Sequence, residues 1–274
     1  MRGADEIQDW HRVELDSEEK SPPPAPLPPI VPRLPLRQID YTNLQEQFRV
    51  LLRKTKAAGS ALASLGDDCW DPVLQSALDH IQLFTLRDDV LRPRDVGMLA
   101  TVRARGSVLG RAERLAYAAR DTNAATRLKW DGQLRTIEEH QSFPALRAKY
   151  CVARVPMPST ALLSVEDRVV GGLLAFHRHK PSQMYCVYFC SAMNPDVFAA
   201  PPSGTRLADV SLSLFITQTT PERCDVDLYL DVRQAPTGSW LTTPAKARLH
   251  ESLRLWVHML EEAVQEWPRY YGKA

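Results

Sequence analysis

Six segments with strand-like patterns follow one another between residues 133 and 232, and one long amphipathic helix follows them. In the last segment Val226, Leu228 and Leu230 alternate with the polar residues Asp227 and Asp231, which predicts a strand with one apolar face. Short connections between consecutive strands predict antiparallel pairing. The expected strands are residues 133–139, 146–155, 168–178, 183–191, 207–218 and 225–232.

The helix expected from Pro244 to Trp267 supplies the cover that a sheet with one apolar face requires. Thr243 before Pro244 is typical of a helix start. The apolar residues lie at helical spacing, so we expect them to face the sheet. This stripe consists of Leu249, Leu253, Trp256, Val257, Leu260 and Val264.

The segments before residue 133 mix helix and strand patterns. Residues 80–86 and 97–104 are predicted strands, residues 109–120 are rich in Ala, Arg and Leu and predict a helix, and Asn123 can cap a further helix ending near Trp130. Trp70 to Leu78 is predicted to be a short helix that begins at Asp71-Pro72. The chain is therefore expected to be α+β, with a curved antiparallel sheet wrapped around a long C-terminal helix.

The N-terminal part divides at about residue 40. We expect residues 1–39 to form a disordered arm that is acidic and then proline-rich, because the prolines of residues 21–36 favour polyproline II over helix or strand. This stretch is typical of a semi-rigid linker, although residues 21–37 also resemble ligands of SH3-like domains. Residues 40–66 predict a helix, with a capping box at Thr42 and Gln45, that docks on a domain of residues 67–274.

Composition excludes several classes of protein. The formal charge of +1 is spread along the chain, which argues against a nucleic-acid partner. No apolar run approaches the roughly 20 residues of a membrane span, and the acidic N-terminus resembles neither a secretory nor a mitochondrial leader. Five dispersed cysteines, mostly in apolar runs, indicate buried thiols rather than disulfides and predict a cytoplasmic protein.

The segment Lys129-Trp130-Asp131, between a short helix and a strand, resembles the START family of lipid-transfer domains. The strand SVEDRVVGGLLAFHR, at residues 164–178, is similar to the family strand that begins with Ser-x-Arg-Asp-Phe, and the likeness covers roughly residues 67–267. Glu166-Asp167-Arg168 replaces the family's Arg-Asp-aromatic pattern, and the Gly-Trp pair of the penultimate strand is missing. The resemblance implies a helix-grip fold that encloses one lipid and catalyses nothing, but it does not carry over the class of lipid.

The expected ligand site is an apolar cavity between the sheet and the C-terminal helix, with an exit at the loop of residues 156–163. The helix stripe would line it, and apolar residues of two loops would form its rim. These rim residues are Met157, Leu162, Leu163 and Phe198. We expect the loop and the helix face with Trp256 and Leu260 to open together at a membrane surface. Alternatively, the two loop leucines simply pack inward.

The predicted function is binding of a sterol, phospholipid or sphingolipid, for transfer between membranes or for sensing. A lipid-regulated scaffold that uses the proline-rich arm is the second hypothesis, and an enzyme built on a helix-grip cavity is the third. No cofactor or metal is expected. His177 and His179 with Cys186 and Cys190 lack the spacing of a zinc site and are interpreted as structural. The aspartates of residues 225–231 are interpreted as a solvated strand face.

Overall fold

The structure is a computed structural model that describes residues 44–73, 80–87, 98–158, 165–179, 182–192, 206–207, 209–233 and 243–272. The chain forms two compact units, Met1–Pro35 and Leu36–Ala274, and every described residue lies in the second. The boundary expected near residue 40 and the capping Thr42 lie outside the described residues.

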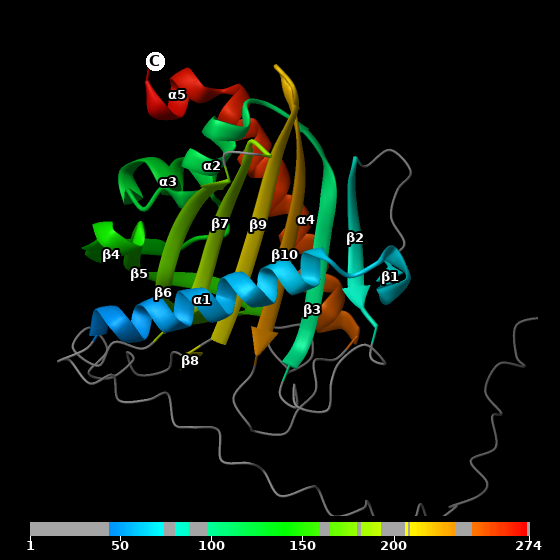
Figure 1. The fold of residues 1–274 in the computed structure, drawn as a ribbon, viewed down its shortest axis with the longest axis horizontal. Coiled ribbons are helices and arrows are strands. Elements are labelled where there is room, and N and C mark those ends of the chain that lie inside the picture. Colours follow the sequence, from blue (N-terminus) through cyan, green and yellow to red (C-terminus); the bar gives the residue numbers. More distant parts are fainter. Residues whose placement is uncertain are drawn as a thin grey trace, which may run out of the picture. The chain divides into compact units, whose positions relative to one another are not determined.

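The described part of the chain contains five helices and ten strands, with seven consecutive strands between α3 and α4. Figure 1 shows their arrangement. The helices are α1 (Leu44–Ala63), α2 (Ala112–Arg120), α3 (Ala124–Trp130), α4 (Thr243–Gln265) and α5 (Trp267–Tyr271). The strands are β1 (Trp70–Pro72), β2 (Ile81–Leu86), β3 (Met98–Leu109), β4 (Thr136–Phe143), β5 (Ala148–Pro158), β6 (Val165–His179), β7 (Met184–Ser191), β8 (Arg206–Leu207), β9 (Asp209–Thr220) and β10 (Arg223–Arg233). Short 3-10 turns precede β1 (Asp67–Cys69) and β5 (Pro144–Leu146).

The strands form one sheet in the order β1-β2-β3-β10-β9-β7-β6-β5-β4, and every pairing along this order is antiparallel. The short β8 pairs in parallel with β6. The order confirms the α+β class and the six consecutive strands predicted from the sequence. In the edge strand β4 the register shifts between Glu139 and Gln141, which leaves His140 as an extra, bulged residue.

The short helix expected at Trp70 to Leu78 is wrong in its first part. Trp70 to Pro72 form β1, which pairs with β2, and residues 74–79 lie outside the described part. A residue before proline is pushed toward extended geometry, and a proline is tolerated on an edge strand. Burial of the Trp70 ring against Tyr229 then fixes the strand.

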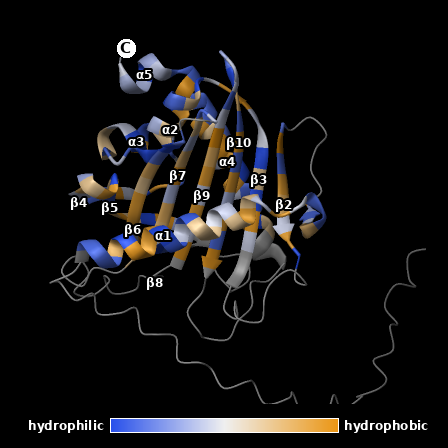
Figure 2. Cartoon of the chain, viewed as in Figure 1, coloured by the Kyte–Doolittle hydropathy of each residue, from blue (hydrophilic) through white to orange (hydrophobic). Residues whose placement is uncertain are grey.

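One face of the sheet, here called the inner face, packs against α2 and α4 (Figure 1). Val226, Leu228, Leu230 and Val232 of β10 are buried there, as their alternation predicted. Figure 2 shows apolar residues interleaved with polar ones along the central strands. The same cluster contains the buried stripe of α4, so the C-terminal helix covers the apolar face as expected.

The opposite, outer face is crossed by α1, as expected for a helix with one apolar side (Figure 1). Phe48 and Leu52 are buried there, with the Phe48 ring stacked on Tyr150. Gly59 lies where α1 crosses β9 at close range, since a Cβ atom at this position would be 2.4 Å from Ser213 Oγ. The glycine therefore lets the helix backbone approach β9.

Of the β10 aspartates predicted to form a solvated face, Asp225 is exposed as expected, whereas Asp227 and Asp231 are not. Asp227 accepts two hydrogen bonds of 2.8 Å from Arg103, and Asp231 is buried. The Arg103 guanidinium also lies over the Trp70 and Tyr229 rings. The prediction failed for these two residues because the aromatic cover of this face comes from distant parts of the chain, and a buried arginine requires a carboxylate partner.

We expect Gly59→Val to lower the free energy of unfolding by about 1–3 kcal/mol, because the added methyl groups would collide with Ser213 where α1 meets β9. Ala58→Val, at the exposed neighbouring position, is the matched control and should cost well under 1 kcal/mol. Urea unfolding measures both. Equal losses in the two variants would contradict the close approach.

Candidate functional site

The C-terminal helix bridges two separated parts of the curved sheet. Its main strand contacts are with β2 and β3 on one side and with β5 on the other, whereas α2 packs against β6, β7 and β9. Five of the six predicted stripe residues are buried in the inner cluster: Leu249, Leu253, Val257, Leu260 and Val264. The sixth, Trp256, is only partly buried.

A row of large apolar side chains on the inner face is incompletely covered. Leu174 of β6, Phe189 of β7 and Leu212 of β9 are cross-strand neighbours in one register row, and all three are only partly buried. The row ends at Leu230 of β10, which is buried. The incomplete cover therefore coincides with the middle strands, where α4 does not make its main contacts.

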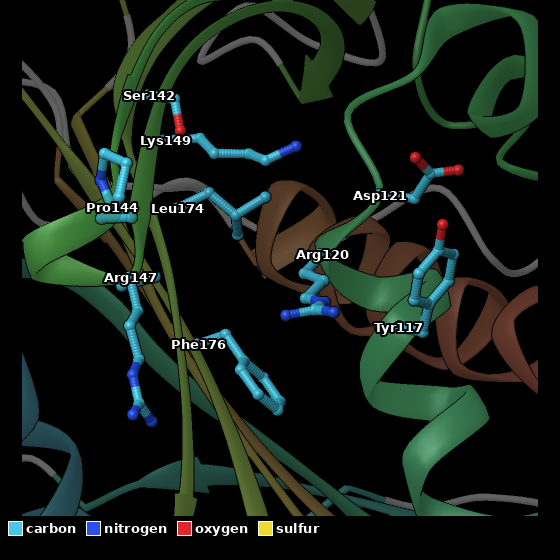
Figure 3. Close-up of a pocket in the computed structure, with 11 residues that line it drawn as sticks. Tyr117, Arg120, Asp121, Ser142, Pro144, Arg147, Lys149, Leu174 and Phe176 are labelled. Carbon is cyan, nitrogen blue, oxygen red and sulfur yellow. The ribbon is translucent and has the colours of Figure 1, made fainter.

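The described residues also form a pocket of about 490 Å³ between the end of α2 and the strands β4 to β6 (Figure 3). It is lined by Tyr117, Arg120, Asp121, Ser142, Pro144, Arg147, Ala148, Lys149, Leu174, Ala175 and Phe176. Leu174 belongs to both the pocket and the partly covered row. The pocket thus adjoins the inner face at Leu174 and combines apolar side chains with three cationic ones.

Two of these cations are held in place. The Arg120 guanidinium lies 4.4 Å from the centre of the Phe176 ring, and Figure 3 shows the two side chains side by side. Lys149 Nζ donates to Glu139 Oε2 at 2.7 Å and to Thr122 Oγ1 at 3.1 Å. Burial alone would raise the pKa of Glu139, but the hydrogen bonds from Lys149 and Thr122 outweigh it and lower that pKa.

The Lys129-Trp130-Asp131 segment has a structural explanation. The buried Asp131 carboxylate accepts hydrogen bonds at 2.9 Å from both Arg127 Nε and Trp256 Nε1, so it ties α3 to α4. Arg127 lies over the Trp130 ring at 4.3 Å, and Trp130 Nε1 donates to the Tyr271 hydroxyl at 3.0 Å. Trp256, which was expected at an opening, is anchored by this network.

The exit loop expected at residues 156–163 is wrong at its start, because residues 156–158 are the end of β5, where the Met157 backbone pairs with Glu166 of β6. The loop residues Leu162, Leu163 and Phe198 lie outside the described residues, and the side chain of Met157 does as well. All five cysteines lie in the part of the chain that the structure describes; none forms a disulfide there, and four of them are buried. Burial raises the pKa of the Cys151 and Cys224 thiols to about 12, which makes both poor nucleophiles. His177 and Cys186 are cross-strand partners, with the histidine exposed and the cysteine buried.

Sequence reasoning missed the residues of the middle strands and of the pocket. Phe189 and Leu212 lie in predicted strands, but nothing local distinguishes them from fully covered neighbours. One signal was available at Gly172, because a Cβ atom there would lie 2.6 Å from the Phe189 ring. A glycine in a strand interior indicates a close approach, which here allows the ring to lie over β6.

We expect Asp131→Asn to lower the free energy of unfolding by about 3–5 kcal/mol, because it leaves the buried Arg127 without its anionic partner. Glu251→Gln, the same change at an exposed carboxylate of α4, is the control and should cost little. Urea unfolding followed by tryptophan fluorescence measures both variants. A loss no larger than that of the control would show that the network does not hold α3 to α4.

The lowered pKa of Glu139 predicts a pH dependence of stability. A depressed folded-state pKa stabilises the fold above the ordinary value of 4.5, and this contribution is lost as the pH falls through the folded-state pKa. Glu139→Gln should therefore lower Tm at pH 6 and reduce the further loss of Tm between pH 5 and pH 3. The exposed neighbour Glu138 provides the control variant Glu138→Gln, and identical acid slopes in both variants would refute the prediction.

Comparison with known proteins identifies the fold. No protein-family model and no curated protein matches the sequence. Among solved structures, human StAR-related lipid transfer protein 5 superposes with a TM-score of 0.59 at 14% identity, over 80% of this chain and 98% of that one. Human STARD10 superposes with a TM-score of 0.57 at 13% identity, over 82% of each chain. A STAR-related lipid transfer protein from Xanthomonas axonopodis superposes with a TM-score of 0.55 at 15% identity, over 73% of this chain and all of that one. The protein has the START-like helix-grip fold.

Proposed function

We propose that the protein binds one lipid molecule between α4 and the inner face of the middle strands, and transfers it between membranes or senses it. The observation that carries this proposal is the partly covered row of Leu174, Phe189 and Leu212. Large apolar side chains inside a fold are normally covered, because burial stabilises them by about 1.5–3 kcal/mol each. A lipid chain would supply the missing cover.

The fold supports the same proposal. Two solved structures with this fold, from human and Xanthomonas axonopodis, are named StAR-related or STAR-related lipid transfer proteins, and a third is named the lipid transfer and protein localization domain of human StarD13. Because α4 makes its main contacts at the two sides of the curved sheet and α2 covers the middle strands only in part, those strands can line a ligand site. Each buried methylene would contribute about 0.8 kcal/mol, so a lipid chain needs no covalent attachment to be retained.

The pocket beside α2 is suited to the polar end of the lipid. Arg120, Arg147 and Lys149 face a space that also contains the Leu174 and Phe176 side chains. Asp121 is the one carboxylate among the lining residues, so cations predominate. We therefore propose that the lipid headgroup is anionic, as in an acidic phospholipid, and that it lies beside α2. The acyl chain of the lipid would lie along the partly covered row of Leu174, Phe189 and Leu212.

Access to the site is proposed at residues 156–163, the end of β5 and the predicted loop after it, with Met157, Leu162, Leu163 and Phe198 as rim residues that contact a membrane surface. The stripe of α4 would form one wall. Of its residues, Trp256 is partly exposed and Leu260 is 1% exposed. The movement that opens the site should therefore involve the loop more than the Leu260 turn of the helix, since separating buried side chains is costly.

The two other hypotheses predict different results. A scaffold would depend on residues 21–37 and would bind its partner whether or not the site is filled. An enzyme would require a general acid or base at the ligand, a role that Tyr117, Asp121 or Lys149 of the described pocket would have to fill, so replacing these residues would abolish turnover. Within the described residues, no helix is long and apolar enough to cross a membrane. We propose that the protein acts in the cytoplasm and contacts membranes transiently.

We expect Leu212→Trp and Leu174→Trp to fill the site and to reduce lipid uptake from liposomes at least about tenfold. Displacing only two methylenes would cost about 1.6 kcal/mol, which is enough for that factor. Leu255→Trp places the same side chain on the exposed face of α4 and is the matched control. Native mass spectrometry counts the bound lipid, and lipid extraction identifies its headgroup.

Thermal unfolding of each variant separates a filled site from a damaged fold. The proposal holds if the inner-face variants keep their Tm and lose lipid while Leu255→Trp retains it. Wild-type protein that takes up no lipid from liposomes containing acidic phospholipid, sphingolipid and sterol would overturn lipid binding. Uptake that is unchanged in both inner-face variants would overturn the location of the site.

A further inference from the structure

Two histidines and a glutamate from distant parts of the chain meet beside the C-terminal helix. His80 immediately precedes β2, whereas His258 and Glu261 lie one turn apart on α4. His80 Nε2 is 2.9 Å and His258 Nδ1 is 4.0 Å from the same carboxylate oxygen, Glu261 Oε2. One potential ligand atom from each residue lies within 4.8 Å of the others. The two imidazole rings are in edge contact, with centroids 4.9 Å apart.

The glutamate of this group is fixed by the fold. Glu261 is buried between the apolar residues Leu260 and Val264 of the α4 stripe. Its Oε1 atom accepts a hydrogen bond of 2.6 Å from the backbone nitrogen of Leu109, at the end of β3. A buried carboxylate is costly unless it is paired, so the position requires strong partners. The bond to Leu109 directs the second oxygen, Oε2, toward the two imidazoles.

We propose that His80, His258 and Glu261 form a site for a divalent transition-metal ion, and that Zn²⁺ is the ion that fits this site best. Two imidazole nitrogens and one carboxylate oxygen are a donor set that zinc accepts, with a fourth position left to water. The side chains of His80 and His258 are 42% and 31% exposed, so an ion can reach them from solvent. The Glu261 side chain is only 10% exposed, so its carboxylate is the ligand whose position the fold fixes.

Zinc coordination requires changes of less than about 1 Å in the two distances to the carboxylate and, because the histidine nitrogens lie within 4.8 Å of each other, an approach of up to about 1.5 Å between them. Tetrahedral zinc with bonds of about 2.0 Å places its ligand atoms about 3.3 Å apart. The His80–Glu261 distance of 2.9 Å would have to open by about 0.4 Å, and the His258–Glu261 distance of 4.0 Å would have to close by about 0.7 Å. Both adjustments fall on partly exposed histidine side chains. The Leu109 hydrogen bond plays the part of the outer-shell partner that orients a metal-binding carboxylate.

A bound ion would connect three elements of the fold. It would join the start of β2 to α4 directly and would engage the end of β3 through the Leu109–Glu261 hydrogen bond. Binding to the folded state alone raises stability by mass action, so Tm should increase with zinc concentration. The rise in Tm with zinc does not depend on a lipid bound at the inner face, so the zinc proposal and the lipid proposal can fail separately.

The test uses the full chain without a polyhistidine tag, treated with EDTA and then dialysed. Equilibrium dialysis against zinc sulfate should show one bound equivalent per chain, and cobalt chloride should give visible absorption bands of a coordinated ion. His80→Gln and His258→Gln should each weaken zinc binding by more than the roughly 10- to 100-fold that loss of an outer-shell partner costs. His179→Gln changes an exposed histidine elsewhere and should bind zinc as the wild type does.

Circular dichroism confirms that each variant is folded, and the zinc-dependent rise in Tm should disappear with His80→Gln and His258→Gln. Zinc that binds with unchanged affinity in both variants would be held by other groups, such as cysteine thiols, and would overturn the proposal. Wild-type protein that binds no zinc and shows no rise in Tm would overturn it as well.

Discussion

The position of the C-terminal helix across the two sides of the curved sheet determines the rest of the structure. Because α4 makes its main strand contacts with β2, β3 and β5, the middle strands receive their cover from α2, and that cover is incomplete. The apolar row on β6, β7 and β9 is the result. The buried part of α4 supplies stability, while the row that it leaves partly uncovered remains available for the ligand proposed above.

Polar groups fix this helix more specifically than apolar packing could. Asp131 receives hydrogen bonds from Arg127 and Trp256, and Glu261 receives one from the backbone of Leu109. Apolar contacts tolerate small rotations of a helix, whereas each buried carboxylate is satisfied in only one position. The first network holds the side of α4 next to α3, and the second holds the side next to β2 and β3.

The sequence predicted the helices and strands well, but it predicted the contacts between residues far apart in the chain poorly. Alternation in β10 and the stripe of α4 identified the inner face, and Asn123 was recognised as the cap of α3, where its side chain accepts from Ala125. Trp70 was misassigned because tertiary burial outweighed a local helix-start signal. The pairing of Asp227 with Arg103 and the meeting of His80 with Glu261 join residues 124 and 181 positions apart, and no local pattern carries such information.

The sheet remains open, and its last strand has an unpaired side. In the described sheet β4 ends the strand order, and such a strand is a template for pairing with another molecule. Here β4 carries exposed charges at Glu138 and Glu139 and a bulge at His140. These features discourage intermolecular β-strand addition, so the protein can keep the open sheet that a helix-grip fold needs without polymerising through its edge.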